Sequence, residues 1–198
     1  MAGKKIGLIL ALDGEKEFNT AATACNKNIR QLNSEMKLVK EESRGQANTL
    51  DTLQKKHRIL ADILEEHKKK EEAVAQGLDH AKENYRSVGE QLDKYEKELS
   101  EAEAALHAMR ESGTASEKEM EDQEKAVQRL KDGIAEGRVI YEKAGNSIKD
   151  WETKLNNAKA QTIKANAALE TNATHLKEAK DSADGCAKSI DEFGKQTK

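Results

Sequence analysis

Residues 78–106 read LDHAKENYRSVGEQLDKYEKELSEAEAAL, and this stretch decides the fold. With Leu78 at position a of a seven-residue repeat, the a and d positions of the stretch are all apolar: Leu78, Ala81, Tyr85, Val88, Leu92, Tyr95, Leu99, Ala102 and Leu106. Apolar residues at a and d form one stripe along an α-helix, and such stripes pack against each other. The stretch therefore predicts a long helix that packs along its length. We call the a and d positions of this frame the seam.

The same frame extends through nearly the whole chain, from Phe18 to Phe193, with a lapse between Gly113 and Gln123. No proline interrupts it, and proline is incompatible with the interior of a helix. Within the seam, the residues that we expect to carry helix packing and oligomerisation are Leu50, Leu53, Leu60, Leu64, Leu78, Tyr85, Leu92, Tyr95, Leu99, Leu106, Ile134, Tyr141, Ile148, Trp151, Leu155, Leu169 and Leu176. The four large aromatic residues in this set are expected to fill wide parts of the seam.

The composition excludes a deep globular core. Charged residues make up 36% of the chain and aromatic residues 3%, so the chain can bury only a narrow stripe. Its 34 basic and 37 acidic residues are mixed along the sequence, which favours a solvated helix surface over binding to nucleic acid. His57 and His67 fall on the seam, where polar residues commonly set register. Cys25 and Cys186 fall on d positions and are expected to be small buried side chains.

The N-terminus differs from the rest of the chain. Ile6, Leu8, Leu10 and Leu12 alternate with Gly7, Ile9 and Ala11, and Asp13-Gly14 follows as a turn signal. We interpret this as a short strand that pairs with another chain or copy, or packs on a helix. The apolar run is short for a secretory signal, and no stretch approaches the roughly 20 apolar residues of a membrane span.

These patterns predict an all-α chain of long heptad-patterned helices, either a coiled coil or elongated helical hairpins, preceded by one short β-strand. We expect a strand and turn at 1–14 and a first helix at 15–43. Two long helical segments should follow, one at 49–111 with a possible break near 86–88 and one at 116–181 with a possible break near 143–147. A short terminal helix and tail should occupy 182–198. Ser116 and Glu119 have the spacing of a capping box. The sequence leaves open whether the helices form an extended rod or fold back, and how many copies associate.

The common catalytic motifs are absent from the sequence: it contains no phosphate-binding loop, no G-x-S-x-G and no H-E-x-x-H. No histidine has a glutamate three residues before it, so the di-iron bundle pattern is missing as well. We therefore expect a structural protein and not an enzyme, without catalytic residues, metal ligands, cofactor or small-molecule substrate.

Several stretches resemble one family. Residues 6–18 (IGLILALDGEKEF), 28–39 (NIRQLNSEMKLV), 141–158 and 182–194 are similar to the N-terminal region of tail tape-measure proteins from long-tailed phages and prophages of Gram-positive bacteria. Members of that family are usually much longer, so the resemblance implies an N-terminal fragment. It also implies a scaffold that sets tail length and assists tail assembly, and that leaves the tail during DNA ejection.

The resemblance further implies tail-tube subunits, tail assembly chaperones and tail-tip proteins as partners, besides self-association. It places the chain in the host bacterial cytoplasm during assembly and then inside the phage tail. An α-helix rises about 1.5 Å per residue, so a single helix of this chain would span roughly 300 Å. Two alternatives remain: a general structural or adaptor coiled-coil protein, and a membrane-acting helical protein.

Overall fold

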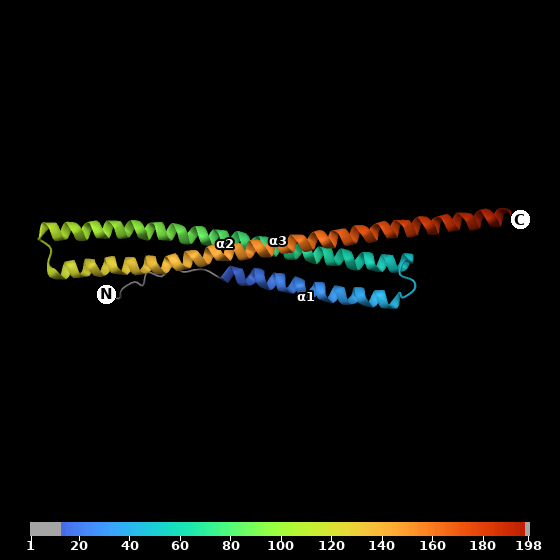
Figure 1. The fold of residues 1–198 in the computed structure, drawn as a ribbon, viewed down its shortest axis with the longest axis horizontal. Coiled ribbons are helices and arrows are strands. Elements are labelled where there is room, and N and C mark those ends of the chain that lie inside the picture. The colour runs from blue at the N-terminus through green and yellow to red at the C-terminus, as the bar shows by residue number, and fades with distance from the viewer. Residues whose placement is uncertain (1–12, 197–198) are drawn as a thin grey trace. The chain divides into compact units, whose positions relative to one another are not determined.

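The computed structural model describes residues 13–196, which form three helices (Figure 1). Helix α1 spans Asp13–Glu42, α2 spans Leu50–Ser112 and α3 spans Glu117–Gln196. The predicted all-α class is confirmed for these residues. The predicted strand, with Ile6, Leu8, Leu10 and Leu12, lies outside the described residues.

The helix boundaries differ from the expected ones in two ways. Helix α1 already includes Asp13 and Gly14, where the sequence indicated a turn. Helix α2 continues through 86–88, and α3 continues through 143–147 and through Gly185, so residues 182–196 belong to α3 and form no separate helix. One glycine within a helix costs only about 1 kcal/mol relative to alanine, which is too little to end a helix that is otherwise well formed.

The turn between α1 and α2 reverses the chain at Gly45, whose φ of 83° is readily adopted only by glycine. The amide of Gln46 donates a hydrogen bond of 2.8 Å to the carbonyl of Ser43. Thr49 precedes the first residue of α2, and its Oγ1 accepts a hydrogen bond from the amide of Thr52 at 3.4 Å. Thr49 therefore acts as the N-cap of α2.

The turn between α2 and α3 contains the predicted capping box, which is confirmed. The amide of Ser116 donates to Oε2 of Glu119 at 2.8 Å, and the amide of Glu119 donates to Oγ of Ser116 at 3.3 Å. The hydrogen bonds from Ser116 hold the pKa of the Glu119 carboxyl below its usual value. Before this box, Gly113 reverses the chain with a φ of 62°. The capping box thereby satisfies two backbone amides at the start of α3.

The chain divides into two compact units. Unit 1 comprises the start of the chain up to Lys16 together with Gln76–Thr153, and unit 2 comprises Glu17–Ala75 together with Lys154–Lys198. Within unit 1, the second half of α2 and the first half of α3 form an antiparallel helical hairpin. Within unit 2, the first half of α2 packs with α1 and with the second half of α3. Each unit is thus folded back, which decides the question that the sequence left open.

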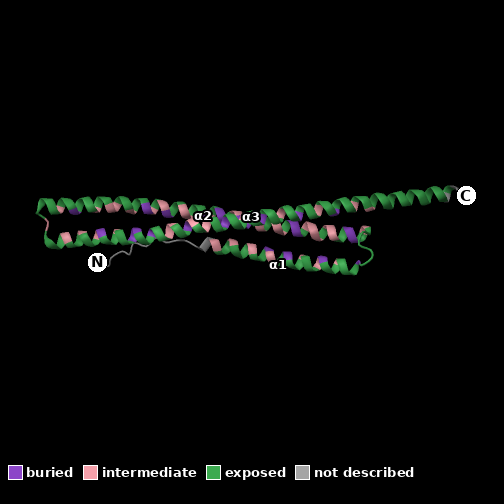
Figure 2. Ribbon diagram, in the orientation of Figure 1, coloured by how far each residue is buried: buried purple, intermediate pink, exposed green. Residues whose placement is uncertain are grey.

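The number of neighbouring helices determines how wide a stripe of α2 is buried (Figure 2). In unit 1, the buried side chains of α2 all lie at a or d, namely Leu78, Ala81, Val88, Leu92 and Leu106. In unit 2, α2 also buries residues outside the seam, at positions c and g: Thr52, Ile63 and Ala73. A helix between two neighbours needs a broader apolar face than a helix with one.

Candidate helix-packing interface

The predicted packing residues lie on the helix faces that contact other helices, and none of them is exposed. Those that are buried are Leu53, Leu64, Leu78, Leu92, Leu106, Ile134 and Trp151. Those that are partly buried are Leu50, Leu60, Tyr85, Tyr95, Leu99, Tyr141, Ile148, Leu155, Leu169 and Leu176. The structure distributes them over two separate interfaces, one in each unit.

The interface of unit 1 is centred on a cluster formed by Val88 and Leu92 of α2 and Ile134 of α3. Partly buried Tyr95, Leu99, Ile140 and Tyr141 pack against this cluster. Burying one such aliphatic side chain contributes roughly 1.5–3 kcal/mol relative to leaving it in water. The hairpin therefore depends on a small number of apolar side chains.

The aromatic residues of unit 1 face glycines on the opposite helix. Trp151 of α3 has only 1% of its surface exposed and lies directly against Gly77 of α2. A methyl group added at Gly77 would lie 2.5 Å from Cη2 and 2.7 Å from Cε3 of the indole, which is closer than carbon atoms can approach. The missing side chain of Gly77 is what makes room for the largest side chain of the interface.

The same arrangement recurs further along the hairpin. The rings of Tyr85 in α2 and Tyr141 in α3 stack with centroids 4.1 Å apart and planes inclined by 23°. A methyl group at Gly89 would lie 3.2 Å from the Tyr141 ring, and one at Gly145 would lie 3.4 Å from the Tyr85 ring. A hydrogen bond with Tyr85, followed by desolvation, raises the pKa of Tyr141. The sequence predicts that these aromatic residues fill wide parts of the seam, but it does not indicate which glycines face them.

Ion pairs flank this apolar stripe and connect the two helices. Lys131 pairs with Glu103 at 2.8 Å, and Arg138 pairs with Glu96 at 2.9 Å. Arg110 pairs with Glu124 at 2.7 Å near the turn. Such solvent-exposed pairs contribute only about 0–1 kcal/mol each. They join α2 to α3 at defined positions and so favour one register of the hairpin.

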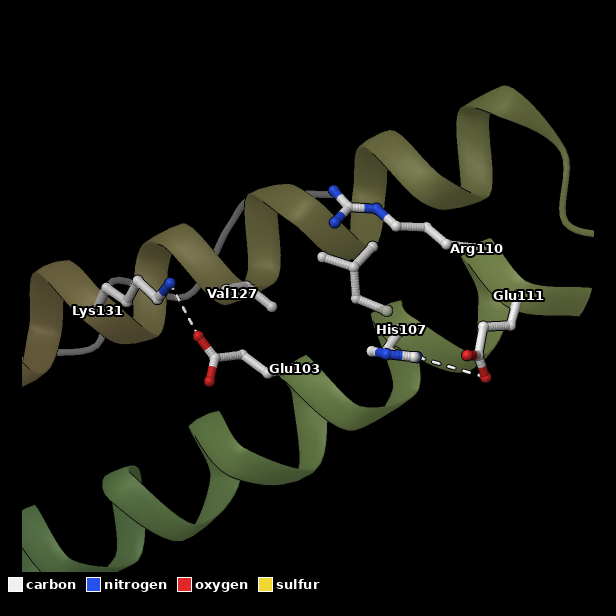
Figure 3. A pocket seen from close by; sticks show the side chains of 7 residues that line it. Glu103, His107, Arg110, Glu111, Val127 and Lys131 are labelled. Atoms are coloured by element: carbon white, nitrogen blue, oxygen red, sulfur yellow. Dashed lines mark ion pairs between the residues drawn. The ribbon is translucent and has the colours of Figure 1, made fainter. Parts of the chain in front are cut away.

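A shallow groove of about 660 Å³ lies between α2 and α3 near the turn (Figure 3). Its apolar floor is formed by Leu106 and Val127, and its other lining residues are Glu103, His107, Arg110, Glu111 and Lys131. Lys131 pairs with Glu103 and Arg110 pairs with Glu124, and Nδ1 of His107 lies 3.5 Å from a carboxylate oxygen of Glu111.

The interface of unit 2 is a cluster to which all three helices contribute. Ile63 and Leu64 of α2 and Ala165 of α3 are buried together. Leu32 of α1, Ile59 of α2 and Leu169 of α3 pack around them. Amide side chains add polar contacts at the edges: Lys70 donates to Gln161 Oε1 at 2.9 Å, and Lys154 donates to Asn19 Oδ1 at 3.1 Å.

The two cysteines have different environments. Cys25 of α1 is buried as expected, and burial followed by the nearby Glu66 carboxylate raises the pKa of its thiol. Asn28 donates a hydrogen bond of 3.0 Å to Glu66 and lowers the pKa of that carboxyl. The prediction for Cys186 is wrong, because its side chain is exposed. Within residues 13–196, no other helix covers α3 at that position.

Polar residues also occupy the seam of unit 2. Asn172, at a d position, is buried and donates a hydrogen bond of 3.0 Å from Nδ2 to the carbonyl of Leu53. Sequence reasoning missed Asn172, although its place in the heptad frame would have identified it. His57 and His67 are partly buried, and Nδ1 of each is enclosed without a hydrogen-bond partner in the described part of the chain. Desolvation, followed by the charge of Lys70, lowers the pKa of His67.

Within residues 13–196, no cluster of three or more histidine, cysteine or acidic residues is arranged to hold a metal ion. Over the same range, no helix combines the length and the apolar character needed to cross a membrane. Comparison of the chain with protein-family models, with curated proteins and with solved structures finds no match.

Proposed function

We propose that the chain is a structural helical scaffold that acts as the N-terminal part of a phage tail tape-measure protein. The scaffold role is supported by one observation above all: in each unit, the predicted packing residues lie on mutually packed helix faces. The phage assignment is supported by the resemblance of residues 6–18, 28–39, 141–158 and 182–194. Its partners in this role are tail-tube subunits, tail assembly chaperones and tail-tip proteins.

The physical basis of such a ruler is the constant rise of a helix, about 1.5 Å per residue. In the folded-back state of unit 1, two helical segments lie beside each other, so two residues share each increment of length. A ruler in this state therefore advances half as far per residue as a single extended helix. This difference makes the proposal quantitative.

Matched deletions in the genome that encodes the chain would test the proposal. Removing two heptads from each side of the hairpin, residues 92–105 and 124–137, keeps the heptad frame intact. If the ruler acts in the folded-back state, tails measured by electron microscopy should shorten by about 21 Å, and if it acts as one extended helix they should shorten by about 42 Å.

Duplication of the same two segments is the matched control, and it should lengthen the tails by the same amount. Tails of unchanged length in both variants would overturn the tape-measure assignment. That result would leave the alternative of a general structural or adaptor coiled-coil protein, which the packing of the helices supports equally well. Purification of the chain with tail-tube subunits would then also be expected to fail.

A further inference from the structure

The C-terminal part of α3 carries an exposed apolar stripe. The stripe consists of Ala183, Cys186, Ile190 and Phe193, which we call the C-terminal stripe. All four are exposed, with Ile190 at 73% and Phe193 at 68% (Figure 2). A contiguous exposed apolar patch marks an interaction surface, whereas single exposed apolar residues are normal.

The C-terminal stripe continues the seam that is buried elsewhere in α3. Its residues fall on a and d of the frame that also contains the buried Ala158, Ala165 and Asn172. The other large exposed hydrophobic residues, Leu38, Val139 and Ile163, lie outside that frame. The exposure of Ile190 is therefore a continuation of an existing helix-packing surface, and not an isolated apolar residue.

The charges around the C-terminal stripe suit pairing between identical chains. The positions that flank the stripe hold Ser182, Ala187 and Ser189, which are uncharged and small. The charged residues of the segment lie on the opposite side of the helix at b, c and f: Asp184, Lys188, Asp191, Glu192 and Lys195. Two copies can thus approach closely without bringing like charges together.

We propose that the C-terminal stripe binds the same stripe of a second copy in antiparallel orientation. Antiparallel pairing centred near residue 188 places Ala183 opposite Phe193 of the other copy, and Cys186 opposite Ile190. Every layer then combines a small with a large side chain, which fills space evenly. Parallel pairing would instead place alanine against alanine and phenylalanine against phenylalanine.

The surroundings of the stripe in unit 2 also favour the antiparallel orientation. Helix α2 begins at Leu50 and runs antiparallel to α3, and a groove of about 650 Å³ at its start is lined by Leu50, Leu53, Ala179 and Ala183, among others. A second copy in antiparallel orientation runs in the same direction as α2 and occupies the place that α2 leaves vacant.

Four apolar layers form a small interface, so the pair should be weak and concentration-dependent. Sedimentation equilibrium of the full chain over a range of concentrations should show reversible dimer formation. Ile190→Asp should abolish the dimer, whereas Ile163→Asp should retain it. Ile163 is the matched control, because it is 69% exposed on the same helix but lies outside the stripe. Circular dichroism should be unchanged for both variants, since neither side chain is buried.

A monomeric wild-type chain at all concentrations, or equal effects of the two substitutions, would overturn the proposal. The orientation is tested by oxidative cross-linking with diamide in a Cys25→Ser background. Ile190→Cys should give a rapid covalent dimer through Cys186 of the other copy, because these positions face each other. The parent with Cys186 alone, and the variant Lys188→Cys on the opposite face, should cross-link slowly. Faster cross-linking of the parent would show parallel pairing and contradict the proposed orientation.

Discussion

Helices α2 and α3 contribute to both units, yet the two units use the same heptad frame differently. In unit 1, two helices bury only a and d, and aromatic rings fit against glycines such as Gly77. In unit 2, α1 adds a third helix, the buried face of α2 widens, and polar residues such as Asn172 enter the seam. A heptad pattern therefore specifies which residues pack, whereas the number of neighbouring helices determines how much of each helix is buried. Unit 1 should consequently be the more sensitive to single changes in its seam.

The largest effect is expected from charges in the seam of unit 1. Leu92→Asp combined with Leu99→Asp places two carboxylates at the central cluster, and we expect a loss of about 4 kcal/mol or more, enough to unfold the hairpin. Hydrogen exchange should show loss of protection in residues 76–153. Val139→Asp is the control, because Val139 is 51% exposed in the same unit. Unchanged protection in the double variant would contradict the seam assignment.

A smaller loss of stability is expected from a substitution at Gly77, against which the indole of Trp151 packs. Gly77→Ala should lower the free energy of unfolding by about 1–3 kcal/mol, because the added methyl group would overlap the buried indole ring of Trp151. Gly185→Ala is the matched substitution at an open position of the same fold, and it should raise helix stability by about 0.4–1 kcal/mol. Urea denaturation of both variants measures the difference. If both substitutions changed the free energy of unfolding in the same direction, the close approach of Trp151 to Gly77 would be unimportant for stability.

Removal of the capping box should lower the free energy of unfolding by less than the substitution at Gly77 does. Ser116→Ala deletes the hydroxyl that accepts from the amide of Glu119, and we expect a loss of about 1 kcal/mol in the stability of unit 1. Glu119→Gln retains the reach of the side chain and should cost less. Thermal unfolding followed by circular dichroism compares the two. A larger effect of Glu119→Gln would show that the carboxylate, and not the hydroxyl, dominates the cap.

The smallest expected effect is a pH dependence of the stability of unit 2. The pKa of His67 is lowered in the folded state, so below about pH 6.5 the unfolded chain binds more protons at this residue than the folded chain does. The contribution of this group to stability is therefore lost as the pH falls through that window. Hydrogen exchange at pH 7.5 and at pH 5.5 should show weaker protection of unit 2 at the lower pH. His67→Gln should reduce this change, and an unaltered pH dependence would assign it to other groups.

The heptad frame allowed the all-α class and the approximate helix boundaries to be predicted from sequence, and the spacing of Ser116 and Glu119 predicted the capping box. The frame could not distinguish an extended rod from folded-back units, because a turn that preserves the heptad phase is compatible with both. It also could not reveal that Cys186 is exposed, since position d specifies an apolar stripe but not whether another helix covers it.

The glycine–aromatic contacts were missed for a related reason. Glycines such as Gly77 and Gly145 have low helix propensity, so by that measure they destabilise the helix. In the structure they leave room for an aromatic ring of the opposite helix. Which glycine faces which ring depends on the register between α2 and α3. That register comes from tertiary packing and from pairs such as Arg138 with Glu96.

The division of the chain into units has a kinetic consequence. Unit 2 is assembled from two segments that are separated in sequence by the whole of residues 76–153, so its formation from an unfolded chain requires a long and entropically costly loop closure. The hairpin of unit 1 consists of contacts that grow outward from one short turn, and it ends where Trp151 meets Gly77. Low contact order favours rapid folding. We therefore expect unit 1 to form first, and its completion to bring the two halves of unit 2 into reach of each other.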